Sequence, residues 1–564
     1  MQKSFAKISY FLKWKAFSRI EAGIIGCIVA LSALILRFGI DNLGSLRVHL
    51  CSKYNPLLVL PAFGLIGGIL CGLLIQYVST DITGSGIPKV KSYLHNHPVA
   101  LNIKVLLAKL IGGILALGTG FALGKEGPTV QVGACTAYIL GRFKIFPAFN
   151  IKQMVASGAG AGLAAAFNAP LSGVLFVIEE LLKDVSGFTI GNTAIACFFA
   201  SVISLALGNR RFDLNNQISL PLTKFSVIDI PFCILLGVAC GVLGALFNKS
   251  LISLCKINNK YFGNKFIIRT ALAGLIVGTT IALLPSSFRD YAGLRHLLLH
   301  GQTSLNYAIT ALIINFILTL ICYASGAPGG LFAPSLTIGC AFGYIFGLME
   351  SYILPHSIFA PTTLSYAGMA AMFSSVARVP ITSMVIVFEI THDFNLFLPL
   401  MICSTVAYLV AEEIYKDSIY DRLLELEGIA IPKSLSESVN ISNITCAQVM
   451  QKKLDTIQVN ATIVEALNLF KTIDHSELPV IDNKKLVGLL AREDIIKAAT
   501  IENNDTINKI YKKNPISVYN TDELKLAIEL LEHYKLYCLP IKAKDSTLLG
   551  ILTRTDIFKT LINL

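Results

Sequence analysis

Charged side chains are scarce in this chain of 564 residues. Only 15% of the residues are charged and 54% are hydrophobic, whereas soluble domains carry about 25% charged residues. Residues 54–80 and 185–209 contain no Asp, Glu, Lys or Arg, and residues 301–377 contain only Glu350. This scarcity excludes a soluble globular protein over most of the length and predicts an integral membrane protein with several spans.

Motifs of metal and disulfide chemistry are also missing. The thirteen cysteines are scattered and form no CxxC pair, so neither a zinc site nor a disulfide framework is indicated. An intramembrane metalloprotease needs paired histidine ligands at helical spacing. No HExxH occurs, and His95 and His97 stand two residues apart beside Pro98, which is typical of a loop. We therefore expect no metal site, no catalytic residues, no required cofactor and no enzyme.

The charge that is present is mostly positive. The formal net charge is +12 with a pI near 9.0, which we attribute to the positive-inside bias of membrane proteins rather than to nucleic-acid binding. Several Lys and Arg residues within 1–20 precede the first apolar run, and no signal peptide is visible. We therefore expect residues 1–20 to be cytoplasmic.

The run GKEGP at residues 124–128 interrupts a long apolar segment. Of the 32 residues between Lys109 and Arg142, only Lys125 and Glu126 are ionised, and charges at the centre of a membrane span are usually functional. Glycine and proline there predict two half-helices, the second starting near Pro128. The N-terminus of that half-helix would form an anion site in the middle of the membrane, which the Glu126 carboxylate can also occupy.

Two similar breaks occur elsewhere, in TGSGIP at 83–88 and GAPGGLFAP at 326–334. A chain with many short apolar runs interrupted by Gly and Pro is typical of a transporter or channel built from broken helices. The apolar runs lie at 22–40, 55–78, 101–123, 128–141, 152–166, 189–207, 230–253, 266–284, 304–323, 335–350, 361–376, 380–390 and 397–411.

The membrane region contains an internal repeat. Pro170-Leu171-Ser172 and Pro380-Ile381-Thr382 each precede a glutamate, Glu179 or Glu389, which lies nine residues after the proline. A G-x-x-x-P frame also occurs twice, at 124–128 and 330–334. The separation of these two frames along the sequence is nearly the same as that of the two proline motifs. The matches favour a duplicated unit of roughly 200 residues, with chance similarity of Gly/Ala-rich helices as the alternative. Paired broken segments predict a binding site near the midplane.

The composition changes after about residue 412, where charged residues become frequent. This soluble tail is also duplicated: GLLAREDI at 488–495 matches GILTRTDI at 550–557. Each half is predicted to run β–α–β–β–α. Neither half alone buries much core, so we expect the two to pack together.

These motifs together resemble the CLC family of chloride channels and chloride–proton exchangers, followed by a tandem CBS-domain pair. The resemblance rests on GSGIP at 84–88, GKEGP at 124–128, GLFAP at 330–334 and Tyr420. It implies a mainly α polytopic membrane protein with an inverted repeat of broken, tilted helices and an α/β cytoplasmic tail. It also implies a homodimer with one anion pathway per subunit. The expected parts are a transport domain at 21–427 with repeats of about 21–210 and 228–415, a linker at 428–443, and CBS domains at 444–500 and 508–564.

The resemblance also assigns residue roles. A dehydrated anion, chloride rather than nitrate because position 85 is Ser, would be held by the Ser85 hydroxyl, the Tyr420 phenol and backbone N–H groups. Glu126 would be the gate that competes with the anion and carries a proton. The expected anion-binding residues are Ser85, Gly86, Ile87, Glu126, Gly127, Leu331, Phe332 and Tyr420.

Glu180 decides between an exchanger and a channel in this resemblance. Exchangers of the family commonly carry an acid at this position, which would collect cytoplasmic protons, so a chloride–proton antiporter is expected. The alternatives are that Glu179 and Glu180 simply cap the solvent end of a helix, and that the protein is a passive chloride channel of the same fold. A divalent-cation transporter would need acidic rings on its pathway, whereas the central break carries Lys125.

The tail carries half of a nucleotide signature. Thr553 and Asp556 stand where CBS pairs often contact a ribose, whereas the first repeat keeps Asp494 but has Ala491 in place of the hydroxyl residue. An adenine-nucleotide sensor and a purely structural dimerisation tail both remain open. The expected location is the inner membrane of a bacterium, with the tail in the cytoplasm.

Overall fold

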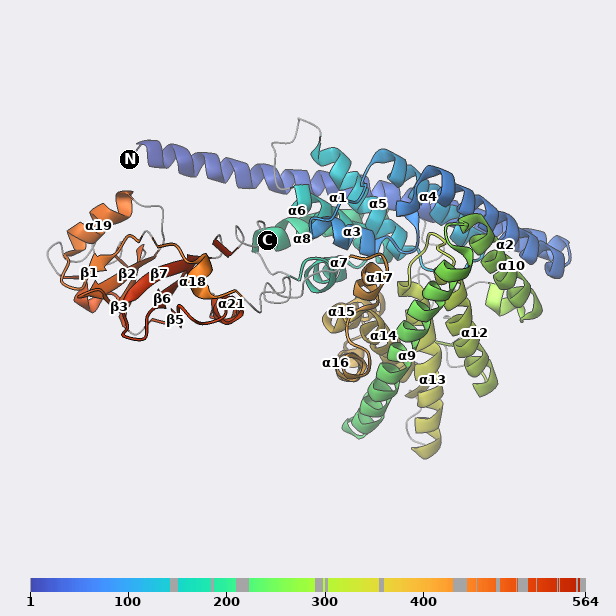
Figure 1. Cartoon of the computed structure of the whole chain (residues 1–564). Helices are drawn as coiled ribbons and strands as arrows, with labels where there is room; N and C mark the ends of the chain where they lie inside the picture. Colours follow the sequence, from blue (N-terminus) through green and yellow to red (C-terminus); the bar gives the residue numbers. More distant parts are fainter. Residues whose placement is uncertain are drawn as a thin grey trace. The chain divides into compact units, whose positions relative to one another are not determined.

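The computed structural model describes most of the chain. The described residues are 2–142, 151–183, 187–208, 223–289, 298–299, 303–354, 360–429, 444–452, 454–472, 477–492, 494–495, 506–513, 515–534, 536, 538–553 and 556–557. They form two compact units, Met1–Ala430 and Ile431–Leu564. The first unit is helical and the second contains small sheets (Figure 1). Most of the expected linker at 428–443 lies outside the described residues.

The first unit consists of helices that follow the apolar runs of the sequence. Within the described ranges, eight helical segments are long and apolar enough to cross a membrane. The helices are α1 (Gln2–Lys53), α2 (Pro56–Leu73), α3 (Ile87–Leu94), α4 (Ile103–Gly118), α5 (Glu126–Gly141), α6 (Ile151–Phe167), α7 (Pro170–Phe176), α8 (Gly187–Leu207), α9 (Ile230–Phe262), α10 (Phe266–Leu283), α12 (Leu305–Ala324), α13 (Phe332–Ile353), α14 (Ala360–Ala377), α15 (Pro380–Thr391), α16 (Phe397–Ile414) and α17 (Ile419–Leu426).

Proline opens several of these helices. It occupies the first or second position of α2, α3, α7, α9 and α15, where its missing N–H costs no helical hydrogen bond. Short π-helical turns continue two of the helices, at Leu74–Val78 after α2 and at Val177–Leu182 (η3) after α7.

Lys109 lies within the expected apolar run 101–123, inside α4, and it is fully buried. Its ammonium group is tolerated there because it donates to the carbonyl oxygens of Ile82 and Gly84, at 2.8 and 2.7 Å. The expected bounds of the first helix, 22–40, are too short, because α1 (Gln2–Lys53) extends beyond them at both ends.

Two helix pairs at equivalent places in the two repeats are packed together. α5 packs on α6, and α13 packs on α14 (Figure 1). Both contacts rely on glycine: a Cβ built on Gly158 of α6 would come within 2.5 Å of the Gly133 carbonyl oxygen, and one on Gly368 of α14 within 2.9 Å of Gly343 Cα. Small residues let the helix backbones approach closely in the absence of water. The expected fold class of the membrane region is confirmed.

The second unit contains two related sheets. One has the order β1 (Ile457–Gln458), β2 (Glu477–Asp482), β3 (Lys485–Ala491), β4 (Lys512–Lys513), and the other β5 (Val518–Tyr519), β6 (Cys538–Lys542), β7 (Leu548–Thr553). In both, the first pair is parallel and the second antiparallel. The connecting helices are α19 (Ile463–Thr472) and α21 (Leu524–His533), so each half begins β–α–β–β as predicted.

The two halves of this unit are interleaved. β4, which lies near the start of the second half, pairs with β3 of the first half, and Gln451 of the first half pairs with Ile551 of β7. Each sheet is therefore completed by a segment that belongs to the other half. This exchange confirms that the halves pack together.

Candidate functional site

The central break places a carboxylate beside a helix N-terminus. α5 starts at Glu126, two residues before the predicted Pro128, and only 2% of Glu126 is exposed. The Glu126 carboxylate folds back over Gly124, where a Cβ would collide with Glu126 Oε2. Glycine at 124 therefore makes room for this side-chain position. The first-turn N–H groups of α5 have no partner within the helix, which makes this end attractive to a negative charge.

The equivalent break of the second repeat lies directly against the first. Gly124 and Gly330 form an isolated antiparallel bridge, in which each N–H donates to the other carbonyl oxygen, at 2.8 and 2.7 Å. Leu331 caps α13 and Phe332 is its first residue. The bridge thus brings the N-termini of α5 and α13 together at one point inside the unit.

The third helix N-terminus is that of α3. Gly86 caps it with φ 83°, in the left-handed region that favours glycine. Ser85 is fully buried and its Oγ accepts from the Ile87 N–H at 3.3 Å. A Cβ on Gly127 would come within 2.7 Å of the Ser85 carbonyl oxygen, so the α3 and α5 ends are in contact. The structure therefore brings Ser85, Gly86, Ile87 and Gly127 to one place.

Two buried tyrosines complete this cluster. Tyr420, the second residue of α17, is fully buried and lies within electrostatic range of Glu126, Glu180 and Tyr323. Tyr323 was missed in the sequence, although it stands just before the third break. Its hydroxyl lies 3.4 Å from both the backbone N and the Oγ of Ser85. Because the Ser85 oxygen accepts from Ile87 and Tyr323, its own proton is directed to another acceptor.

A cavity of about 400 Å³ adjoins the Ser85 loop. Gly84, Gly86 and Tyr323 form part of its wall, together with Lys89 and Arg269. Arg269 is anchored by donation to the Ala324 carbonyl oxygen at 2.8 Å, and Lys89 pairs with Glu427 at 2.8 Å. A cavity with basic side chains at its wall attracts anions. It lies beside the N-terminus of α3.

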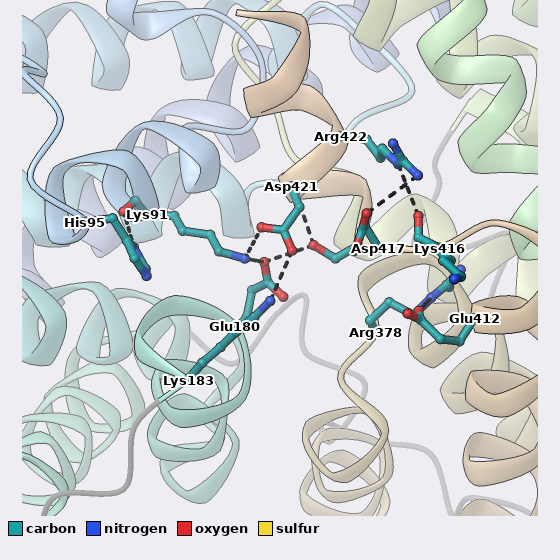
Figure 2. A network of polar contacts seen from close by, with 11 residues as sticks. Lys91, His95, Glu180, Lys183, Arg378, Glu412, Lys416, Asp417, Asp421 and Arg422 are labelled. Carbon is teal, nitrogen blue, oxygen red and sulfur yellow. Dashed lines mark hydrogen bonds and ion pairs between the residues drawn. The ribbon is translucent and has the colours of Figure 1, made fainter. Parts of the chain in front are cut away.

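Glu180 occupies a different environment from Glu126 (Figure 2). It lies in the π-helical turn after α7, and only 1% of its side chain is exposed. Its Oε1 accepts from Lys91 Nζ at 2.5 Å and from Ser418 Oγ at 3.2 Å. The alternative that Glu180 caps a solvent-facing helix end is therefore wrong, because the carboxylate is inside the protein and ion-paired.

Lys91 and Asp421 were not singled out in the sequence. Lys91 Nζ also lies 2.5 Å from Asp421 Oδ1, and Asp421 Oδ2 accepts from Lys183 Nζ at 3.1 Å. The available signals were a Lys at the fifth position of a helix that starts at an anion-site motif, and an Asp directly after Tyr420. Without the fold, neither residue can be distinguished from the ordinary charged residues that lie at a membrane surface.

The tail residues form a local cluster of their own. Thr553 ends β7, and its N–H and hydroxyl donate to Asp556 Oδ2 at 3.0 and 2.6 Å. Gln451 Nε2 donates to Asp556 Oδ1 at 2.7 Å. Ala491 ends β3 at the equivalent place. The Thr and Asp are therefore adjacent, as a shared role requires, while the first half lacks the hydroxyl.

The fold and site define a multi-span membrane transport protein in which broken helices direct their N-termini at one buried point. The family described as voltage gated chloride channel matches residues 67–412, and the CBS domain matches residues 446–500 and 507–563. This chain therefore belongs to the voltage gated chloride channel, or CLC, family and carries a CBS pair.

Similar proteins include curated transporters from two bacteria. The H(+)/Cl(-) exchange transporter ClcA of Vibrio campbellii (strain ATCC BAA-1116) is 32% identical over 419 residues, 72% of this chain and 88% of its own. The protein of the same name from Vibrio parahaemolyticus serotype O3:K6 (strain RIMD 2210633) is 34% identical over 359 residues, 62% and 76% respectively.

Solved structures show the same fold. A slow cyanobacterial Cl-/H+ antiporter is 28% identical with a TM-score of 0.68, over 73% of this chain and 98% of its own. A eukaryotic CLC transporter is 22% identical with a TM-score of 0.66, and the match covers 97% of this chain and 98% of that protein. At that identity the second likeness shows only the fold, and it extends through both units.

Proposed function

We propose that this protein exchanges chloride for protons across the membrane. The observation that carries the proposal is the presence of two buried carboxylates with different surroundings. Glu126 lies against the N-termini of α5 and α13, where an anion would bind, whereas Glu180 lies in an ion-paired network beside α3 and α17. The exchange transporters among the relatives support the same activity.

In this proposal the anion is held by the three helix ends, the Ser85 hydroxyl and the Tyr420 phenol. Ionised Glu126 takes the place of the anion at the α5 N-terminus, and protonated Glu126 leaves it. Because the donors of the anion path repel protons, a second carboxylate must admit them, and Glu180 has that role. Tyr420 is within electrostatic range of both Glu126 and Glu180, so it is near the anion site and near the proton entry.

The test uses purified protein in lipid vesicles with chloride and pH electrodes. A chloride gradient should drive protons uphill in the wild type, and Glu180→Gln should stop proton movement while chloride flux continues. Glu350→Gln, which removes another buried carboxylate on α13, is the matched control and should remain coupled. Chloride movement without any proton movement in the wild type would select the passive channel. Equal coupling in Glu180→Gln would place proton entry elsewhere, with Glu179 the first candidate.

Regulation and assembly belong to the same proposal. The CBS pair would bind an adenine nucleotide at Thr553 and Asp556 and transmit its occupancy to transport. The protein would act as a homodimer in the inner membrane of a bacterium, with the N-terminus and tail in the cytoplasm. Support for the nucleotide comes from the adjacency of Thr553 and Asp556 at the end of β7.

A further inference from the structure

Lys91 is a buried cation shared by two carboxylates from different helices. Its Nζ lies 2.5 Å from Glu180 Oε1 and 2.5 Å from Asp421 Oδ1, and its side chain has 0% exposure. Asp421 is 12% exposed and continues to Lys183, which is 48% exposed, at 3.1 Å. Figure 2 shows the ends of the four side chains gathered in one network. The network connects Lys183, whose side chain is 48% exposed, with Glu180, whose side chain is 1% exposed.

The charges of this network balance only while Glu180 is ionised. Two ammonium groups face two carboxylates, so a proton added to Glu180 leaves one positive charge in excess. A buried ammonium that loses its partner is strongly destabilised. Lys91 escapes this penalty because Asp421 lies at the same distance from its ammonium group as Glu180 does.

We infer that Asp421 is a positioning residue for proton uptake at Glu180, because it retains Lys91 whenever Glu180 carries a proton. The inference rests on the proposed function of Glu180. A hydronium ion gives its proton to a Glu180 oxygen and becomes water, and one O–H bond forms as another breaks. Lys91 keeps all its protons and stays paired with Asp421. When Glu180 passes the proton on, the Lys91–Glu180 ion pair forms again.

Other ionisable groups near Glu180 do not supply this balance. Glu179, on the same turn, accepts from the N-terminus of α15, and His95 Nδ1 faces the Lys91 carbonyl oxygen at 2.8 Å. α7 contains no titratable residue, and Lys152 of α6 pairs with Asn96. The remaining titratable groups on the packed helices are Lys89 and Tyr93 of α3, and Tyr420, Arg422 and Glu425 of α17.

Removal of the negative charge of Asp421 and removal of the positive charge of Lys91 should shift the pH dependence of proton uptake in opposite directions. In Asp421→Asn, Lys91 has Glu180 as its sole carboxylate, so proton uptake should need a more acidic pH. In Lys91→Met, Glu180 loses its cation and faces a like charge, so uptake should persist to a more alkaline pH. An opposite charge at this range shifts titration by about one to three pH units. A merely structural role for either residue would lower chloride and proton flux together and move neither midpoint.

The experiment measures chloride-driven proton transport against pH in lipid vesicles for the wild type, both single variants and the double variant. Midpoints that move to acid for Asp421→Asn and to alkaline for Lys91→Met, with chloride flux retained, support the inference. Shifts of equal sign, or no shift in a coupled wild type, overturn it. Glu425→Gln, which removes an exposed ion-paired carboxylate from the same helix, should keep the wild-type midpoint.

The double variant protects the test against misfolding of Asp421→Asn. Removing Asp421 in the Lys91→Met background takes away a negative neighbour of Glu180, so the midpoint should return toward acid. An unmoved midpoint in that comparison overturns the inference as well. If the wild type transports no protons at all, the proposed function itself has failed, and that result is distinct from an unshifted midpoint.

Discussion

Glu179 of the first repeat caps the helix that begins at Pro380 in the second, through Thr382. Its Oε2 accepts from the Thr382 N–H at 2.7 Å and from the Thr382 hydroxyl at 2.5 Å. Glu389 does the same with Ser172, at 2.8 and 2.5 Å. The two glutamates that the sequence pairs as repeats are therefore reciprocal helix caps between α7 and α15.

The reciprocal caps predict a symmetric loss of stability. Glu179→Gln and Glu389→Gln each weaken three charge-assisted bonds at a helix N-terminus, so each should destabilise the protein by about 1–2 kcal/mol. Thermal unfolding in detergent measures the effect. Glu413→Gln on α16, whose carboxylate lies outside these caps, is the control. Unchanged melting in both variants would mean that the caps contribute nothing.

Glu126→Gln should abolish proton coupling and leave chloride movement. Glutamine keeps the size of the side chain but cannot ionise, so it neither competes with the anion as a charge nor carries a proton. Paired chloride and proton electrodes on vesicles measure both fluxes, with Glu350→Gln as the control. Uphill proton pumping by Glu126→Gln would remove Glu126 from the shared step.

Gly124→Ala should displace the Glu126 carboxylate without changing its chemistry. The added methyl group would occupy the space of Glu126 Oε2, so the side chain should leave the α5 N-terminus. We expect chloride flux several-fold above the wild type and fewer protons per chloride. Gly44→Ala, at a position where a Cβ meets nothing within 4 Å, should behave as the wild type. Normal coupling in Gly124→Ala would contradict this account of the gate.

Ser85→Pro should shift preference from chloride toward nitrate. Proline removes the hydroxyl donor and also the N–H that donates to the Tyr323 hydroxyl. Loss of these donors should weaken the binding of a compact anion more than that of a diffuse anion. Relative flux of the two anions in vesicles is the measurement. Ser92→Ala, a buried serine at the far end of α3, is the control. Equal selectivity in Ser85→Pro and wild type would argue against Ser85 as a ligand.

A nucleotide at the CBS pair should stabilise the full-length protein by linkage. Millimolar ATP, ADP or AMP is expected to raise the melting temperature of the wild type but not of Thr553→Val. Thr547→Val removes a hydroxyl that donates to Asp545 in a nearby turn and should respond as the wild type. If no nucleotide moves the wild-type midpoint, the tail is a structural or dimerisation module.

The sequence was informative where one residue type has one conformational use. Glycine and proline at 84–88, 124–128 and 330–334 correctly predicted the broken helices, because few other residues suit such turns. Lys91 and Asp421 were missed because a charged residue near an apolar run has the same appearance whether it meets water or a buried partner. Their partners lie on other helices, so only the fold distinguishes the two cases.

Tyr323 and Glu179 illustrate a second limit. A tyrosine within an apolar helix has no spacing that indicates a hydrogen bond to Ser85, which lies on another element. The repeat correctly paired Glu179 with Glu389, but their function as caps depends on contacts between the repeats. Sequence similarity within a chain identifies equivalent residues and does not tell which copy each one touches.

The bridge between Gly124 and Gly330 has a mechanical consequence. Two further backbone hydrogen bonds, from the Gly84 N–H to the Gly326 carbonyl and from the Gly329 N–H to the Gly84 carbonyl, lie beside it. These bonds connect the two repeats at the buried point where their helices begin. Rocking one repeat against the other would break these backbone bonds in a place without water to replace them. Under the proposed function, exchange would therefore proceed by movement of the Glu126 side chain within a fixed backbone frame, and not by reorientation of one repeat against the other.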